Sequence, residues 1–196
     1  REGEELFLKG DRSFTDKAAR RLQVKPGQSQ SNFRQKYSEY AIRLREKQKL
    51  KRIFGLTEKQ FRNNYIKAAK QLGVTGNNLI SNLERRLDNV VYRLGFLSSR
   101  SEARQYVNHG HVLVNGKKVD ICSYIVSLDD EIGIREKSRD NVRIKSSLES
   151  VARRGVPEWL ELDSEKIIGK IKRLPIRDDF KQPIDEQLII EFYSKL

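Results

Sequence analysis

The chain has 196 residues, 37% of them hydrophobic, so it is long and apolar enough to bury a core and is not a disordered basic tail. Its formal net charge is +13, and residues 1–80 supply most of the excess, with 19 Lys and Arg against 8 Asp and Glu. This imbalance predicts a polyanionic partner, either nucleic acid or an acidic membrane surface. No apolar run approaches the roughly 20 residues of a membrane span. The single cysteine, Cys122, excludes an intramolecular disulfide framework.

The first part of the chain divides into an extension and a helical region. Residues 1–37 hold few apolar side chains and include a Pro-, Gly- and Ser-containing stretch typical of linkers, so they are predicted to form a basic, irregular N-terminal extension. Residues 38–53 are predicted to form a helix. The capping-box pattern of Thr57 and Gln60 predicts the start of another helix, whose apolar face continues to Leu72.

The helix predicted at 38–53 is crowded with cations, six within ten positions against the single acid Glu46. Such a run is often only a solvated face. Here, however, cations lie on nearly every side of the helix and would repel one another, and a phosphate-lined partner would remove that repulsion. We therefore predict that this helix and the next contact a polyanion. The predicted contacts are Arg43, Arg45, Lys47, Lys49, Lys51, Arg52 and Arg62.

Residues 81–135 are predicted to form a compact helix–helix–hairpin unit. Two capping-box patterns, Ser81–Glu84 and Ser99–Glu102, each precede apolar residues at helical spacing. Gly95 and Gly110 follow these periodic segments and are predicted to end the two helices. This segment is therefore the most regular part of the chain.

A hairpin follows the second of these helices. Asn115–Gly116 is the strongest short signal for a tight hairpin turn, and it lies between predicted strands at 112–114 and 117–119. Further strands are predicted at 124–126 and 132–135. The hairpin tip carries two lysines, which adds to the cations on the preceding helices.

The second helix of this unit is predicted to bind phosphate, because its N-terminus concentrates amide donors and its first turns carry Arg100 and Arg104. The alternative is a small α+β core with a solvated charged rim. The residues of the unit predicted to contact a phosphate-bearing partner are Arg85, Arg86, Asn89, Arg93, Arg100, Ser101, Arg104, His109, His111, Asn115, Lys117 and Lys118.

The last third of the chain is predicted to contain a short helix at 140–154 and an edge strand at 156–163, with Pro157 at its start. The apolar segment 183–195 is predicted to be a helix that returns to the first domain. The predicted fold class is therefore α+β. A mostly helical domain is formed by residues 38–80 plus 136–196, and the small α-α-β RNA-binding domain by residues 81–135.

No catalytic or metal-binding constellation emerges. Walker, dinucleotide-binding, zinc-helix and kinase motifs are absent from the sequence. Arg86-Leu87-Asp88 imitates a pseudouridine-synthase motif, but no stretch remains for the large separate catalytic domain of those enzymes. His109 and His111 have no third ligand in view. We therefore predict a protein that is not an enzyme and that has no cofactor.

Several blocks of the sequence resemble the bacterial small-subunit ribosomal protein S-four family, in the right order and over nearly the whole chain. The central blocks are similar to the RNA-binding domain named after that protein. The matching blocks are Leu44–Leu50, Gln60–Asn63, Leu83–Phe96, Ser101–Gln105, His109–Gly116, Pro157–Leu160, Pro175–Asp179 and Glu186–Ser194.

The resemblance implies a primary rRNA-binding protein of the cytoplasmic small ribosomal subunit. It implies docking at a multi-helix junction in the five-prime domain of small-subunit rRNA, nucleation of assembly, and a neighbour, small-subunit protein S-five. It also implies a place on the mRNA entry channel, with an influence on translational accuracy and with Arg34 and Lys36 in the loop facing mRNA. Many relatives hold zinc with four cysteines, but Ser13 and Ala18 stand at two of those positions, so we predict no zinc.

Two other classes remain as alternatives. One is a stand-alone RNA-binding enzyme or tRNA-handling factor that uses the same small domain, and the missing catalytic residues argue against it. The other is a structural or membrane-surface protein. Sedimentation with the small subunit would favour the ribosomal prediction over the first alternative, and flotation of nuclease-treated protein with liposomes would test the second.

Overall fold

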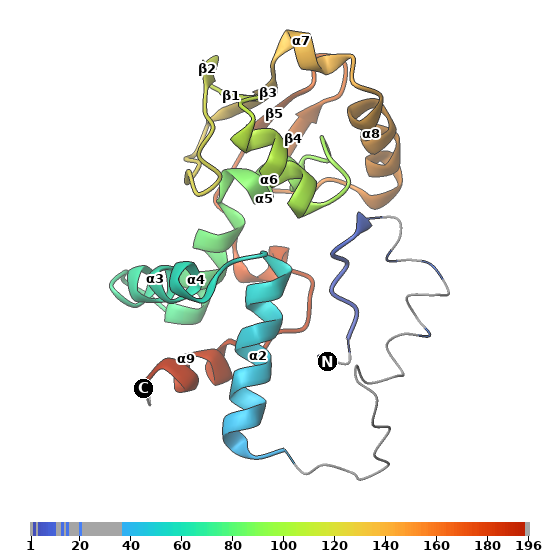
Figure 1. Ribbon diagram of the computed structural model, residues 1–196. Helices are drawn as coiled ribbons and strands as arrows, with labels where there is room; N and C mark the ends of the chain where they lie inside the picture. The colour runs from blue at the N-terminus through green and yellow to red at the C-terminus, as the bar shows by residue number, and fades with distance from the viewer. Residues whose placement is uncertain are drawn as a thin grey trace. The chain divides into compact units, whose positions relative to one another are not determined.

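The computed structural model describes residues 37–194 together with residues 2, 4–10, 13, 15 and 20, and for residues 150 and 152–154 it describes the backbone alone. The chain divides into two compact units. The first comprises residues 1–63 and 182–196, and the second comprises residues 64–181. Figure 1 identifies the elements of each unit by label and by colour along the chain.

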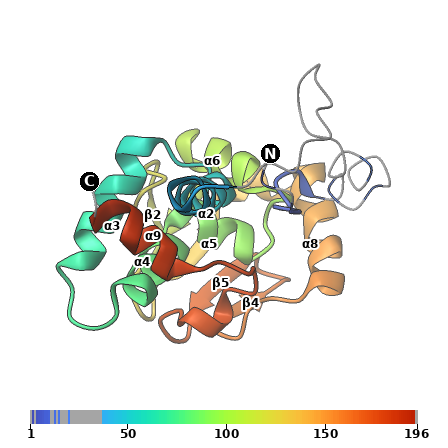
Figure 2. The ribbon, with the colours of Figure 1, turned by 90° about the horizontal axis from the view of Figure 1, so that it is seen from below.

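The first unit is helical. It contains α2 (Glu39–Ile53), the beginning of α3 (Glu58–Ala69) and α9 (Glu186–Ser194). The predicted capping box is confirmed, since the Gln60 amide donates to Thr57 Oγ1 and the Thr57 amide donates to Gln60 Oε1. Helix α9 packs beside α2, as both views show (Figures 1 and 2), so the predicted return of the C-terminal segment is also confirmed.

The second unit combines helices with an antiparallel sheet of strand order β2-β1-β3-β5-β4. Helices α5 and α6 lie against this sheet (Figure 1) and share one apolar core with it. Its elements are the end of α3, α4 (Thr75–Glu84), α5 (Leu87–Arg93), α6 (Arg100–Asn108), β1 (Val112–Val114), β2 (Lys117–Lys118), β3 (Glu131–Ile134), α7 (Glu136–Arg139), α8 (Val142–Arg154), β4 (Leu160–Asp163), β5 (Ile168–Ile171) and the 3-10 turn η2 (Arg177–Asp179).

The core of the second unit holds α5 close to the sheet. Leu87, Val90, Val91 and Leu94 are fully buried, as the spacing of the apolar residues predicts. At Gly169 in β5 a methyl group would collide with the Leu94 side chain, so glycine is required for the helix to approach this strand. This close packing fixes the positions of the polar side chains on the other faces of α5.

The predicted hairpin is confirmed in its turn chemistry. Asn115 and Gly116 have φ values of 49° and 76°, and two positive φ angles in a two-residue loop are typical of a type I′ turn. Val114 pairs with Lys117 across the turn. The two residues of β2 are exposed, so the lysines at 117 and 118 face solvent.

The predicted start of a helix at Ser81 is wrong. Ser81 lies within α4, which ends at Glu84, and the chain turns through Arg85 and Arg86 before α5 begins. The Glu84 carboxylate is used by side chains of α5 rather than by the Ser81 backbone. The break is stabilised from outside the helix, because a later segment supplies the hydrogen-bond partners that the broken helix loses.

That later segment is the stretch predicted as a strand at 124–126. The amide of Leu87 donates to the Tyr124 carbonyl over 2.8 Å, and the amide of Val126 donates to the Arg85 carbonyl over 3.0 Å. The stretch therefore forms an isolated bridge between Arg86 and Ile125 rather than a strand of the sheet. Its pairing with the α4–α5 break explains both differences from the prediction.

Residues 136–181 fold with 64–135, whereas the sequence-based boundaries place them with residues 38–80. The reason is strand β5, which pairs with both β3 and β4. The predicted helix at 140–154 is present as α8, and the predicted edge strand is shortened to β4. A short strand containing Gly169 and Lys170 has neither the length nor the alternation that identifies a strand in sequence.

Candidate nucleic-acid interface

The N-terminus of α6 is capped by its own side chains. Ser99 Oγ accepts a hydrogen bond from the Glu102 amide over 3.3 Å. The Glu102 carboxylate accepts from the Ser98 amide and the Ser98 hydroxyl, one residue before the predicted capping-box partner. A carboxylate thus lies beside the first turn, where a phosphate was predicted to approach. Electrostatic attraction at this end must therefore come from arginine side chains more than from the helix terminus.

A buried carboxylate joins α5 to α6. Asp88 is 3% exposed and accepts hydrogen bonds from two arginines. Arg86 donates from Nε to Oδ1 over 3.1 Å and from Nη2 to Oδ2 over 2.9 Å, and Arg104 donates to Oδ2 from Nε over 3.0 Å and Nη2 over 2.7 Å. The Arg86 side chain is buried, but that of Arg104 is 29% exposed. This group carries a net charge of +1, with Arg104 at its solvent side.

A second buried carboxylate, Glu84, lies at the end of α4. Arg93 donates to it from Nε over 2.9 Å and from Nη2 over 2.6 Å, and Asn89 donates to it over 2.8 Å. Asn89 Oδ1 accepts from Arg100 Nε over 2.7 Å, and the Arg100 guanidinium lies 4.5 Å from the centre of the Tyr92 ring. Glu84 is therefore linked to both Arg93 and Arg100.

The pKa shifts of this second group follow from its geometry. Burial alone would raise the pKa of Glu84, but the charge and hydrogen bonds of Arg93, the charge of Arg100 and the hydrogen bond from Asn89 lower it. Burial alone would lower the pKa of Arg93, and the pairing with Glu84 raises it. Both partners are thus held in their charged forms. The net charge of the group, counting Arg100, is again +1.

The remaining predicted residues of this unit differ in exposure. Arg85 is partly buried and donates from Nε to the Val126 carbonyl over 2.9 Å. His111 is partly buried, with Nδ1 2.9 Å from Ser138 Oγ, and burial together with the charges of His109 and Arg135 lowers its pKa. The predicted residues that are exposed are Ser101, His109, Asn115, Lys117 and Lys118.

Asn115 has a structural role beside its predicted one. Its Nδ2 donates to the Asp130 carboxylate over 2.8 Å, and its Oδ1 accepts from the Glu131 amide over 2.9 Å. The side chain thereby ties the hairpin turn to the start of β3. The lysines at the hairpin tip therefore lie beside a turn whose conformation is stabilised by these two hydrogen bonds.

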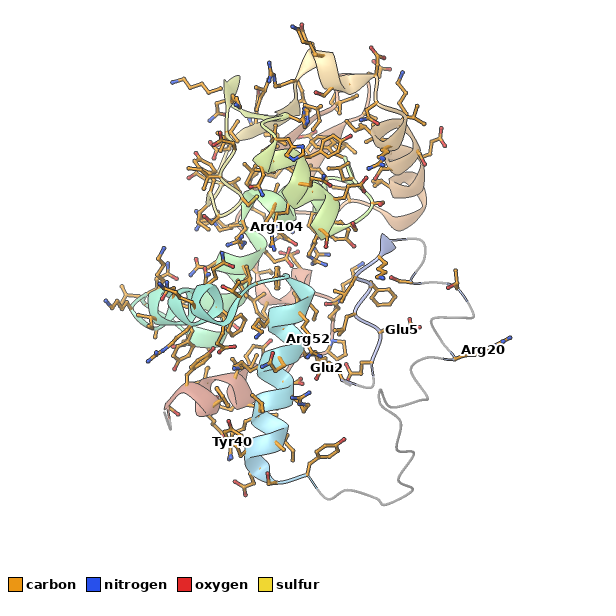
Figure 3. The ribbon with its side chains drawn as sticks, viewed as in Figure 1. Glu2, Glu5, Arg20, Tyr40, Arg52 and Arg104 are labelled. Atoms are coloured by element: carbon orange, nitrogen blue, oxygen red, sulfur yellow. The ribbon has the colours of Figure 1, made fainter. Side chains whose placement is uncertain are left out.

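The cations of α2 in the first unit are neutralised by acids of the same unit. Lys47 and Lys51 both contact Glu58, over 2.7 and 3.1 Å. Arg43 contacts Glu191 over 2.7 Å. The other pairs on α2 are Arg43 with Glu39, Lys49 with Glu4 and Glu46, and Arg45 and Arg52 with Glu2. Figure 3 shows Arg52 and Glu2 close together beside the helix.

Helix α3 differs from α2 in this respect. Its Lys59, Arg62 and Lys67, with Lys70 just after it, are all exposed, and none forms an ion pair with another residue that the structure describes. Only Arg62 belongs to the predicted contact set. The others were missed because a few lysines spaced along a helix are common on any soluble protein. The signal that distinguishes them is the lack of nearby acids between Glu58 and Glu84 in the sequence.

Comparison with known proteins shows which family this chain belongs to. The model of the Ribosomal protein S4/S9 N-terminal domain matches residues 1–84, and the model of the S4 domain matches residues 85–132. The small ribosomal subunit protein uS4 of Pelobacter propionicus is 58% identical over 196 residues, covering 100% of this chain and 94% of the relative. The corresponding proteins of Trichlorobacter lovleyi and Syntrophus aciditrophicus are 57% and 53% identical with the same coverage. The chain belongs to the uS4 family.

Membership of the uS4 family confirms the resemblance found in the sequence, and with it the α+β fold class. The family consists of structural ribosomal proteins rather than enzymes, which agrees with the predicted absence of catalysis. The S4-domain match covers α5, α6, the hairpin and the first two residues of β3, and it therefore includes Asp88 with both of its partners, Arg86 and Arg104.

The burial of several predicted contacts requires a correction of their role. Lys47, Lys49, Arg86 and Asn89 are at most 5% exposed, and their polar groups are bonded inside the protein. Because these groups are already bonded, we expect them to support neighbouring side chains rather than to meet a phosphate themselves. The predicted contacts that are exposed or partly exposed lie mainly on α6, at the hairpin tip, on α3 through Arg62, and on α2 through Arg43, Arg45, Lys51 and Arg52.

Some predictions fall outside the described residues. Arg34 and Lys36, predicted to face mRNA, and Ala18, at one presumed zinc position, all lie there. Ser13 is described, and its hydroxyl accepts from the Lys9 amide over 3.1 Å. Within the described part of the chain there is no group of three or more potential metal-binding side chains. None of the helices described there combines the length and apolarity needed to cross a membrane.

Proposed function

We propose that this protein is a structural constituent of the small ribosomal subunit, working in the cytoplasm, and that it binds rRNA directly. The observation that carries the proposal is the pair of buried carboxylate clusters in the S4 domain. Each has a net positive charge and an arginine of α6 at its solvent side. RNA helices are recognised largely through phosphates and 2′-hydroxyls, so fixed, partly exposed guanidinium groups suit that partner.

The contact surface that we propose is smaller than the set of cations in the sequence. In the S4 domain it comprises Arg100, Ser101, Arg104 and the hairpin tip with Lys117 and Lys118. These residues are exposed or partly exposed. In the helical region it comprises the exposed cations of α3. Cations of α2 contribute where an RNA phosphate replaces the surface acid with which they pair.

The family also suggests where in the small subunit the protein binds and which molecules lie beside it. We propose that the protein binds early in assembly at a multi-helix junction of the five-prime domain. Its neighbour there is small-subunit protein S-five, and Arg34 and Lys36 lie towards the mRNA entry channel. The dispersal of exposed cations over α3, α6 and the hairpin supports a junction, because several RNA helices meet there with different backbone directions.

Binding to isolated rRNA tests the primary proposal. The purified protein is titrated onto small-subunit rRNA and onto an equal mass of tRNA, and the protected nucleotides are mapped on the rRNA. We expect saturable binding to one region of the five-prime domain that excess tRNA does not displace. Equal affinity for tRNA, or protection scattered over the whole rRNA, would contradict a dedicated ribosomal site and favour an RNA-handling factor.

A further inference from the structure

The side chain of Asp88 presents an unusual feature for a protein whose partner is polyanionic. It is a buried carboxylate that accepts hydrogen bonds from an arginine on the proposed RNA-binding surface. We propose that Asp88 is a positioning residue for rRNA binding, which holds Arg104 in the orientation that RNA recognises. This inference rests on the proposed function, because it assigns a role within the same surface.

The geometry favours orientation over simple charge neutralisation. Arg86 already forms two hydrogen bonds with the carboxylate from the buried side, so one unit of negative charge is balanced there. Arg104 adds two more hydrogen bonds to Oδ2 from another helix. Its planar guanidinium is thus fixed in direction through both Nε and Nη2, while the side chain stays partly exposed.

A fixed arginine binds a phosphate with a smaller loss of conformational freedom than a mobile one. A free arginine side chain samples many rotamers, and ordering it on binding reduces affinity. The contacts to Asp88 impose that order before RNA arrives. A buried ion pair adds little net stability compared with apolar packing, so its presence is better explained by the geometry it specifies.

The same arrangement occurs one helical turn earlier on α6. Arg100 is held through Nε by Asn89, and Asn89 is held by the buried Glu84. Arg100 and Arg104 are four residues apart and therefore lie on one face of the helix. Two neighbouring arginines of that face are thus both fixed by polar side chains of α5, and both chains of contacts end on a buried carboxylate.

The substitution Asp88→Asn tests the proposal, because the positioning role and simple electrostatics predict opposite changes in rRNA affinity. Removing a negative charge raises the net positive charge of the protein, so electrostatics alone predicts tighter binding to rRNA. The positioning role predicts weaker binding, by about tenfold, because Arg104 loses its orientation. Affinity is measured by filter binding on the full chain, with the folded fraction determined by circular dichroism at the same temperature.

Two further variants separate positioning from folding. Asp120→Asn removes an exposed carboxylate of the same unit, near Lys118, and should leave affinity unchanged or slightly raised. Arg86→Met/Asp88→Asn keeps the net charge constant and removes the buried pair together, so that no buried arginine is left without a partner. We expect this double variant to fold and still to bind rRNA about tenfold more weakly.

A double-mutant cycle with Arg104→Lys completes the test. Lysine cannot use the two-pronged contact with Asp88, so Asp88→Asn should weaken binding far less in that background than in the wild type. Equal weakening in both backgrounds, or unchanged affinity of the folded Asp88→Asn protein, would overturn the positioning role. Failure of the wild-type protein to bind rRNA would instead overturn the proposed function.

Discussion

Helices α2 and α6 both carry arginines that the sequence assigns to RNA, but they differ in the acids that face them. Several acids facing α2 are on the surface: Glu39, paired with Arg43, is 81% exposed and Glu58, paired with Lys51, is 46% exposed, although Glu2 is buried. The acids behind α6, Asp88 and Glu84, are both buried. Surface pairs are weak and exchange readily with a phosphate, whereas buried pairs are fixed by the fold. The difference teaches that a cation's partner, rather than its charge alone, determines its role.

Removing a buried acid should have the largest effect on stability. Glu84→Ala leaves Arg93 and Asn89 without their shared partner, so we expect the free energy of unfolding to fall by about 3–5 kcal/mol. Urea denaturation measures this change. Glu39→Ala, which removes an exposed acid paired with Arg43, is the matched control and should change stability by less than about 1 kcal/mol. Similar losses of stability in the two variants would contradict the difference proposed between the acids of α2 and those behind α6.

Charge reversal on α6 should affect both binding and stability. Arg104→Glu places a second carboxylate beside Asp88, so we expect a loss of about 1–3 kcal/mol of stability together with weaker rRNA binding. The sequence alone predicts weaker binding with unchanged stability, because it does not reveal the contact with Asp88. Melting curves and filter binding on Arg104→Glu and Arg104→Lys separate the two effects. An unchanged melting temperature in Arg104→Glu would show that the contact with Asp88 contributes nothing.

The pattern of the sequence was sufficient for the local features of the S4 domain. The Asn115–Gly116 turn, the Ser99 cap and the apolar face of α5 each depend on a few neighbouring residues, and each is confirmed. The break between α4 and α5 could not be predicted, since its hydrogen bonds come from the distant residues 124–126. Strand β5 was missed for the same reason, because its pairing with β3 rather than its own composition defines it.

The candidate site was predictable in its residue types but not in its geometry. The arginines at 86, 93, 100 and 104 are evident as cations near helix turns. Which of these arginines are buried and which are exposed depends on the polar side chains of α4 and α5 that bind them. Spacing along one helix identifies partners three or four residues apart, and Asp88 and Arg104 are separated by sixteen positions.

The smallest effect concerns pH and the surface acid of the first unit. Burial alone would raise the pKa of Glu58, but hydrogen bonds from Lys47, Tyr193 and Lys51 lower it from 4.5 to about 2. A lowered folded-state pKa contributes stability that is present above about pH 4.5 and is lost as the pH falls towards about 2. Because Glu58 is half-exposed, we expect less than about 1 kcal/mol. The difference between wild type and Glu58→Gln in acid titrations of stability should vanish at the acid end, and a constant difference would contradict this assignment.

The central claim is that the arginines of α6, fixed by buried carboxylates, make the phosphate contacts of the S4 domain. The salt dependence of rRNA binding by Arg100→Gln/Arg104→Gln tests it most directly, against the control Lys145→Gln/Lys166→Gln. The control loses the same charge from exposed positions of the same unit that lie outside the proposed surface. We predict that the slope of log affinity against log salt decreases by about 1.4–1.8 in the arginine variant and stays near the wild-type value in the control. Equal slopes for the two variants would contradict the claim.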